Sequence, residues 1–373
     1  MAKRLRVGVI FGGRSGEHEV SLWSAESVLD AMDPAKYEVV PIGIRPDGQW
    51  VVGTTPSLML TGTAAPDEKP VVLPADPAMR SVVPLPSADA PAGIPGLGEP
   101  LDVIFPVMHG TYGEDGCIQG LLELAGIAYV GSGVMASAVG MDKAIMKAVF
   151  SQRGLPILPY LVVRRVDWES TGPKVQEEAE KSLGYPLFVK PANLGSSVGI
   201  SKVHAAEEFE PAMAEAFRYD TKVVVEKGLL AREVEVAVLG NERPRASVPG
   251  EVVPHREFYD YEAKYQPGGS DLIIPAPLAQ DQVDELKRLA IEAFLAVDAA
   301  GMARVDFFVA RDTGRIYLNE INTIPGFTRT SMYPKLWEKS GLPYRDLIDE
   351  LIRLALERHA TRARLARAYR PQA

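Results

Sequence analysis

The chain of 373 residues has almost no cysteine and no long apolar segment. Its single cysteine, Cys117, excludes an internal disulfide and fits a reducing compartment, where a packed thiol is the simplest interpretation. The start from Met1 to Arg6 is basic, and the apolar run that follows, Val7 to Phe11, is too short for a signal peptide or a membrane span. These features predict a cytoplasmic protein that does not use a membrane.

The sequence also lacks an excess of positive charge. A net charge of −9 argues against general nucleic-acid binding, which requires a basic face. The G-x-G-x-x-G dinucleotide fingerprint does not occur where the first strand meets its helix, so NAD binding is not predicted. A hydrophobic content of 46% over this length instead predicts a globular protein of two or three domains.

The first part of the chain has the order of a parallel α/β domain. A β-branched run (Arg6 to Phe11) precedes a glycine-rich turn (residues 12–16), a stretch with helical spacing (Glu17 to Met32) and a second strand (Val39 to Ile44). The stretch from Thr54 to Pro100 then holds ten of the 30 prolines. It predicts an extended excursion with short strands.

The remaining pattern suggests two further units. We expect domains at residues 1–128, 129–232 and 233–373. The second unit is predicted to begin with one helix from Met135 to Arg153, and the third to end in an arginine-rich, solvated terminal helix after Leu356.

The strongest local signal is a predicted hairpin with a turn at Asp312 to Gly314. Strand alternation about this turn places Asp306 opposite Glu320 and Arg304 opposite Asn322. Opposed carboxylates repel each other unless a cation lies between them, and their oxygens suit Mg²⁺. A solvated polar face in which Arg304 neutralises the acids is an equally good interpretation of this segment alone.

Three weaker signals concern phosphate and nucleotide binding. Lys190 ends a strand before a glycine/serine loop, which suits a phosphate cradle but also an ordinary loop. The strand and hinge at residues 223–230, with Glu233, can offer groups to a purine and a ribose, although an exposed strand edge is the default. Lys143 and Lys147 have helical i, i+4 spacing, which usually places lysines in solvent.

In this order the four segments resemble the nucleotide site of the ATP-grasp superfamily. Five longer stretches narrow the resemblance to the D-alanine–D-alanine ligase family, over nearly the whole chain except the proline-rich excursion and the last residues. They are residues 11–21 (FGGRSGEHEVS), 109–120 (HGTYGEDGCIQG), 131–137 (GSGVMAS), 258–265 (FYDYEAKY) and 322–333 (NTIPGFTRTSMY).

The resemblance implies a Rossmann-like parallel-sheet domain at the N-terminus, followed by a two-lobed ATP-grasp fold. It implies ligation of two D-alanine molecules through an acyl phosphate, with release of ADP and phosphate, for peptidoglycan precursors. The expected cofactors are ATP as co-substrate, two Mg²⁺ (or Mn²⁺) ions and an additional K⁺ ion. The expected assembly is a homodimer.

The resemblance also assigns residues to roles. The catalytic set is Glu17, Ser196, Tyr265 and Arg304. The substrate contacts are His109, Lys264, Ser331 and Met332. The ATP contacts are Lys143, Lys190, Ser197, Glu226, Lys227, Leu229, Glu233 and Phe258. The metal ligands are Asp306, Glu320 and Asn322.

Three alternatives stand beside this interpretation. A D-alanine–D-lactate (or D-serine) ligase is the nearest, and the Lys264-Tyr265 pair in a predicted lid at residues 257–270 argues against D-lactate. Another ATP-grasp enzyme, such as a carboxylase subunit, would not need the segments around Glu17 and His109. An inactive nucleotide-binding module would not need the full set of metal and phosphate residues.

Overall fold

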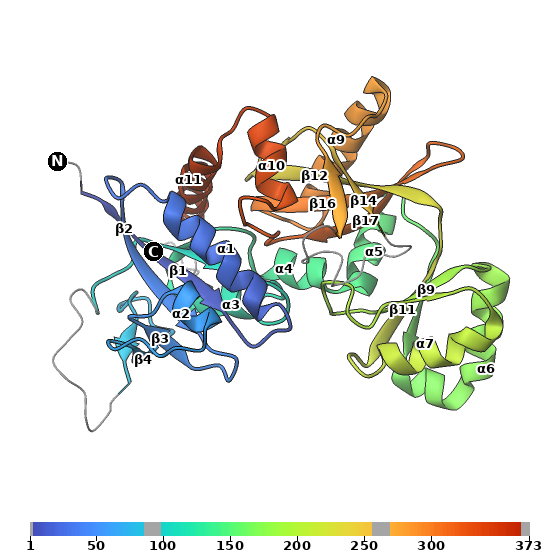
Figure 1. Cartoon of the computed structure of the whole chain (residues 1–373), viewed down its shortest axis with the longest axis horizontal. Coiled ribbons are helices and arrows are strands. Elements are labelled where there is room, and N and C mark those ends of the chain that lie inside the picture. The colour runs from blue at the N-terminus through green and yellow to red at the C-terminus, as the bar shows by residue number, and fades with distance from the viewer. Residues whose placement is uncertain (1–2, 86–97, 256–268, 367–373) are drawn as a thin grey trace, which may run out of the picture.

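The computed structural model describes residues 3–85, 98–255 and 269–366. Its strands form three sheets of seven, four and six strands, and Figure 1 shows them as three bodies arranged along the long axis. Phe258, Lys264 and Tyr265, and nearly all of the predicted lid, lie outside the described residues.

The N-terminal sheet has the strand order β5-β4-β3-β2-β1-β6-β7, with β1 parallel to β2 and β6, and β6 parallel to β7. The α1 helix follows β1, as the α/β pattern predicted, and the α3 helix follows β6. The proline-rich stretch holds short antiparallel strands, as expected, and a short helix that was not predicted. The elements are β1 (Leu5–Gly12), α1 (His18–Ala31), β2 (Tyr37–Ile44), β3 (Trp50–Val52), α2 (Pro56–Leu60), β4 (Lys69–Val72), β5 (Val83–Pro84), β6 (Val103–Val107), α3 (Cys117–Ala125) and β7 (Ala128–Tyr129).

The prediction of one helix from Met135 to Arg153 is wrong, because the chain breaks at Asp142. This residue has an extended backbone (φ −85°, ψ 99°), and its carboxylate accepts hydrogen bonds from the backbone N–H groups of Ala144 and Ile145. Asp142 therefore caps a second helix, as short acidic side chains do. The two helices are α4 (Val134–Met141) and α5 (Lys143–Gln152).

The four-stranded sheet is antiparallel, in the order β10-β9-β11-β8. Its buried core lies against the α6 and α7 helices, which the sequence pattern had not indicated. The elements are β8 (Tyr160–Arg164), α6 (Arg165–Ser182), β9 (Leu187–Pro191), β10 (Ser201–Val203), a 3₁₀ turn (Ala206–Glu208), α7 (Phe209–Ala216) and β11 (Lys222–Lys227).

The six-stranded sheet is also antiparallel, and it contains the predicted hairpin. Arg304 pairs with Asn322 and Asp306 with Glu320, as expected, and a bulge follows Asp306. The elements are β12 (Ala231–Gly240), β13 (Arg245–Ala246), β14 (Gly250–Pro254), β15 (Ser270–Ile273), α9 (Gln280–Ala296), β16 (Gly301–Ala310), β17 (Ile316–Asn322), α10 (Met332–Lys339) and α11 (Tyr344–Ala363).

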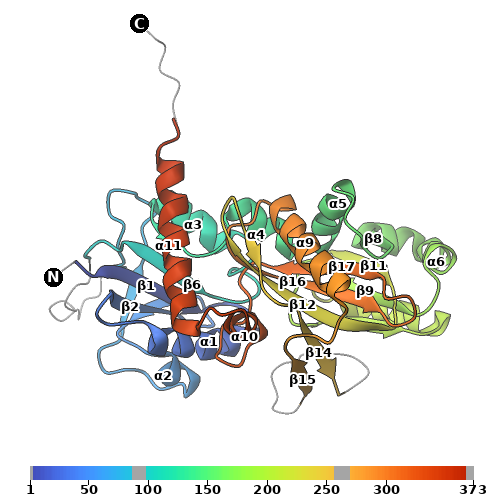
Figure 2. The ribbon, with the colours of Figure 1, turned by 90° about the horizontal axis from the view of Figure 1, so that it is seen from above.

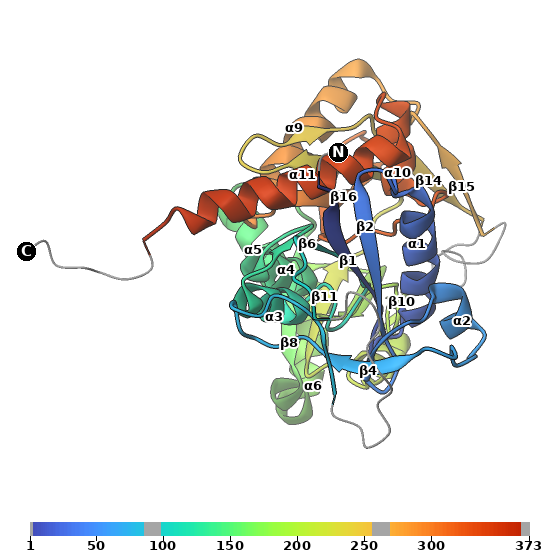
Figure 3. The ribbon, with the colours of Figure 1, turned by 90° about the vertical axis from the view of Figure 1, so that its left-hand side faces the viewer.

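The terminal helix α11 is not a simple solvated helix, which corrects the sequence-based expectation. It returns to the N-terminal sheet, as Figures 2 and 3 show. The Arg358 guanidinium stacks 4.3 Å from the centre of the Tyr129 ring and donates to the carbonyls of Tyr129 and Gly131, and Arg362 pairs with Glu123. These contacts join the first and last parts of the chain. Within the described ranges, no helix is both long and apolar enough to cross a bilayer.

Candidate active site

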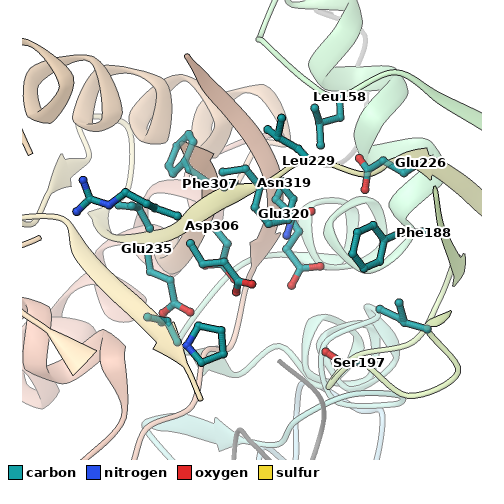
Figure 4. Close-up of a pocket in the computed structure, with 18 of the residues that line it drawn as sticks. Leu158, Phe188, Ser197, Glu226, Leu229, Glu235, Asp306, Phe307, Asn319 and Glu320 are labelled. Carbon is teal, nitrogen blue, oxygen red and sulfur yellow. The ribbon is translucent and has the colours of Figure 1, made fainter. Parts of the chain in front are cut away.

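A cavity of about 410 Å³ lies between the four-stranded sheet and the six-stranded sheet (Figure 4). Side chains from β9, β11 and the glycine/serine loop form one wall, and side chains from β12, β14, β16 and β17 form the other. Eleven residues named from the sequence line it: Lys143, Lys190, Ser196, Ser197, Glu226, Lys227, Leu229, Glu233, Arg304, Asp306 and Glu320. Segments far apart in sequence therefore meet at one cavity.

The acidic wall of the cavity is built by the hairpin and its neighbour β12. The Arg304 guanidinium donates to both carboxylate oxygens of Asp306 at 2.7 Å, and its Nε lies 2.9 Å from Glu235. Burial lowers the pKa of Arg304, but Asp306 and Glu235 together raise it well above the usual value. Arg304 thus stays charged between two acids.

The donors on this wall suit a hard divalent cation. Asp306 and Glu320 face each other across the strand pair, and the Asn322 amide donates to Asp306 at 3.0 Å. Nowhere in the described part of the chain do three or more acidic, histidine or cysteine side chains form a metal-binding group. Two carboxylates and one amide leave coordination positions for phosphate and water oxygens, which is how Mg²⁺ is commonly bound beside nucleotides.

The opposite wall carries the cations. Lys190 donates to one carboxylate oxygen of Glu226 at 2.6 Å, while Lys143 donates to the Leu194 carbonyl at 2.7 Å and lies 3.7 Å from Glu320. Lys147, expected in solvent, is buried and pairs with the other oxygen of Glu226. Burial would raise the pKa of Glu226, but the two lysines lower it below its usual value.

Glu17 joins the N-terminal body to the glycine/serine loop. It lies directly before α1, and its carboxylate accepts a hydrogen bond from the Ser196 hydroxyl. Gly110 allows the carboxylate to approach, since a Cβ there would lie 2.5 Å from Glu17 Oε2, and its φ of +71° favours glycine. The contact between Glu17 and Ser196 places Glu17 beside the glycine/serine loop that lines the cavity.

His109 is buried and contacts both the N-terminal helix α1 and the segment that follows β17. Its Nδ1 lies 3.0 Å from the Ile324 carbonyl, its Nε2 lies 3.1 Å from the Ser24 hydroxyl, and Glu114 is 3.5 Å from Nδ1. Burial raises the pKa of Glu114 to about 7. Burial alone would lower the pKa of His109, but Glu114 raises it above its usual 6.5.

This pair predicts a loss of stability as pH rises. Both folded-state pKa values are raised, so the stabilisation is complete below the unfolded values and is lost as pH rises through about 7. From pH 5 to 8, the Tm of the native chain should fall by about 2–4 °C more than that of Glu114→Gln. Scanning calorimetry tests this, with the exposed Glu19→Gln as control. If the Tm of the native chain and that of Glu114→Gln fall equally between pH 5 and 8, the raised pKa values assigned to Glu114 and His109 are wrong.

Ser331 and Met332, two of the predicted substrate contacts, lie at the start of α10. Ser331 is the residue before the helix, and its hydroxyl lies 2.7 Å from that of Thr328. Met332 is buried in the core, so its side chain is a packing element, while its N–H belongs to the first helical turn. First-turn N–H groups lack helical partners and suit a carboxylate. Neither residue lines the main cavity.

Three charged residues that contact the site residues named above were given no role from the sequence. Glu235 contacts Arg304, Glu114 lies beside His109, and Lys147 pairs with Glu226. The alternation of β12, which places Glu233 and Glu235 on one face, was the available signal for Glu235. Glu114 lies within the glycine-rich stretch at residues 109–120, and the i, i+4 spacing of Lys147 with Lys143 favours a solvent position.

The fold and this cavity define the class, an ATP-grasp ligase. Two family models match the chain, the D-ala D-ala ligase N-terminus over residues 6–132 and the D-ala D-ala ligase C-terminus over residues 149–353. The chain belongs to the D-alanine–D-alanine ligase family.

Individual relatives agree with this assignment over the full length. The chain is 51% identical over 361 residues to a D-alanine–D-alanine ligase of Geobacillus kaustophilus, covering 95% of this chain and 96% of the relative. A D-alanine–D-alanine ligase from Coxiella burnetii has a similar solved structure, with a TM-score of 0.81, 37% identity and 97% of each chain covered. The VanG D-Ala:D-Ser ligase from Enterococcus faecalis has a TM-score of 0.83 at 34% identity, covering 95% of this chain and 100% of that chain.

Proposed function

We propose that this enzyme joins two D-alanine molecules at the cavity between the two sheets, using ATP and releasing ADP and phosphate, for peptidoglycan precursor synthesis. The observation that carries the proposal is that Lys143 and Lys190 lie on one wall of the cavity, while Arg304, Asp306 and Glu320 lie on the other. The family membership of the whole chain supports the choice of substrate. A cytoplasmic location follows from the need for ATP.

The cavity supplies separate groups for each part of ATP. The hinge residues Lys227 and Leu229 offer backbone groups to adenine, and Glu233 accepts from the ribose hydroxyls. Lys143 and Lys190 contact the phosphates, and the Ser197 hydroxyl adds a donor from the loop. We assign the adenine contact of Glu226 to its backbone, since its carboxylate is engaged by two lysines.

We assign the divalent ions, two Mg²⁺ or Mn²⁺, to Asp306, Glu320 and Asn322. Bound there, they would neutralise phosphate charge. A K⁺ ion remains part of the proposal from resemblance alone. The three ligands are held by the hairpin register rather than by a loop, so their spacing is fixed before the nucleotide arrives.

The first D-alanine is placed between the N-terminal body and the phosphate loop. Glu17 receives its ammonium, and the hydrogen bond from Ser196 orients the carboxylate that does so. The carboxylate of D-alanine then attacks the terminal phosphate of ATP, which gives an acyl phosphate and ADP. Arg304 stabilises the negative charge that develops on the acyl group.

The second D-alanine is held by its carboxylate at Ser331 and the first turn of α10. Its free amine attacks the acyl carbon, the bond between that carbon and the phosphate oxygen breaks, and the proton lost by the amine is balanced by release of hydrogen phosphate. His109 is assigned to this end of the site. Since both of its ring nitrogens have partners, we propose that it orients the acceptor region rather than moves a proton. Lys264, Tyr265 and Phe258 keep their assigned roles from resemblance.

The product assay tests this function directly. With ATP, Mg²⁺ and D-alanine, we expect D-alanyl-D-alanine and one phosphate per dipeptide, with L-alanine a poor substrate. Mass spectrometry of reactions containing equal D-alanine, D-serine and D-lactate identifies the preferred acceptor. Phosphate release without D-alanine and without dipeptide would refute the proposal, while a dominant D-serine product would move the enzyme toward the activity named for the VanG relative.

We further propose that the chain has an N-terminal domain at residues 1–128 and two ATP-grasp lobes at residues 129–232 and 233–373. We propose that the enzyme is a homodimer formed through the N-terminal domain. This rests on resemblance to the family. Sedimentation velocity at micromolar concentration should give about twice the 40.5 kDa mass of the chain. A single monomeric species would contradict it.

A further inference from the structure

The carboxylate of Glu226, which lines the cavity, pairs with two lysines. Glu226 is 1% exposed, and its two oxygens are paired with the ammonium groups of Lys147 and Lys190, the latter at 2.6 Å. Lys190 lines the cavity, whereas Lys147 does not. The cluster therefore has one cation that can reach a ligand and one that is enclosed behind it.

The position of Lys147 is a costly place for a charge. Lys147 lies on the buried face of α5 with Met146 and Phe150, and its side chain is 1% exposed. A buried ion pair is often no more stabilising than apolar side chains of the same size. An apolar residue would suit the packing of this helix face, so stability alone does not account for the lysine.

The strand register places Lys190 beside Glu226, so a movement of Lys190 toward a ligand would break this ion pair. β9 and β11 pair with Lys190 opposite Val224 and with Phe188 opposite Glu226, which makes Lys190 and Glu226 diagonal neighbours on the same face. If Lys190 moved to a phosphate, a Glu226 with no other partner would be left as an unpaired buried charge. Such a charge is strongly destabilising.

We propose that Lys147 is a positioning residue that neutralises Glu226 and so allows Lys190 to bind the nucleotide phosphates. This inference rests on the proposed ATP site. Lys147 acts through Glu226 and does not touch the ligand. When Lys190 binds a phosphate, it exchanges the carboxylate of Glu226 for the phosphate. Glu226 remains paired with Lys147 throughout.

The test is a double-mutant cycle of Lys147→Met and Glu226→Gln, with ATP, ADP and adenosine binding measured by calorimetry. Lys147→Met should weaken ATP and ADP by about tenfold or more, a typical coupling for contacting charged groups. Adenosine, which has no phosphate, should bind as it does to the native enzyme. In the Glu226→Gln background, Lys147→Met should change ATP affinity by less than about threefold, because no buried charge remains to be paired. The exposed Lys174→Met is the matched control.

A purely structural role gives a different pattern. It would lower the Tm of Lys147→Met while leaving ATP affinity unchanged in the folded fraction, or weaken ATP and adenosine equally, and either result overturns the proposal. If Lys147→Met does not fold, the double variant decides, since a large loss of ATP affinity relative to Glu226→Gln also overturns it. Dipeptide synthesis by the native enzyme is measured in parallel. Its absence would refute the proposed function, whereas normal synthesis with unaltered binding in Lys147→Met refutes only this inference.

Discussion

Glu320→Ala is expected to abolish ligation while the protein remains folded. Glu320 faces Asp306 across the hairpin, and its carboxylate lies 3.7 Å from Lys143. Removal of a proposed metal ligand that also lies beside Lys143, a lysine proposed to bind phosphate, should lower kcat/KM by about 10³-fold or more. The side chain is 24% exposed and its loss removes a like-charge contact, so the free energy of unfolding should change by less than about 1 kcal/mol.

Two measurements separate metal loss from misfolding in Glu320→Ala. Thermal unfolding shows whether the fold is retained, and Mn²⁺ binding, followed by paramagnetic resonance in the presence of ADP, should weaken or lose a site. Glu177→Ala, an exposed carboxylate on α6, should match the native enzyme in both. Near-normal turnover by Glu320→Ala at saturating Mg²⁺ would show that the hairpin carboxylates are not the metal site.

The hairpin was predictable because its information is local. Alternating residues on both strands and the turn around Thr313 predict the pairing of Arg304 and Asp306 without reference to the rest of the chain, and the structure has these two pairs. The bulge between Asp306 and Phe307 lies between the turn and these two pairs. On the turn side of it Phe307 pairs with Leu318 and Val309 with Ile316, one residue away from the register of a hairpin centred on Thr313. The same reasoning placed β1 and α1, where an apolar run and a helical spacing meet at a glycine turn.

The break at Asp142 and the burial of Lys147 were not predictable in this way. Helical periodicity continues across residues 135–153, so only the competition of the Asp142 side chain with the helix backbone reveals a cap. Lysines at i and i+4 have the same spacing whether their face meets solvent or a protein wall. Glu226, which makes the burial of Lys147 tolerable, lies on β11, far along the sequence.

The contact of Glu235 with Arg304 was not predictable from a single segment either. Glu235 meets Arg304 only because β12 and β16 are neighbours, with Glu235 in register with Asp306. A single sequence gives the alternation of each strand but not which strands pair. The family resemblance supplied roles for many residues, but it did not indicate that Arg304 is held between two carboxylates.

That arrangement makes Arg304→Lys the second informative substitution. The guanidinium donates to both Asp306 oxygens while its Nε also lies beside Glu235, and the lysine ammonium cannot reproduce this planar geometry. The positive charge is retained, so the two acids keep a cation and the fold should survive. Loss of a pre-positioned donor to the developing negative charge should lower kcat by about 10²–10³-fold.

The effect of Arg304→Lys should be confined to the chemical step. Lys143 and Lys190 on the opposite wall remain in place, so the KM for ATP should change by less than about threefold, a pattern typical of an interaction made in the transition state. Arg315→Lys, on the same hairpin but exposed, should have native kinetics. Steady-state kinetics with phosphate detection gives both constants. A raised KM for ATP with an unchanged kcat would place Arg304 in ground-state binding of the nucleotide. Its contacts with Asp306 and Glu235 would then position it to bind the nucleotide phosphates rather than to stabilise the acyl group.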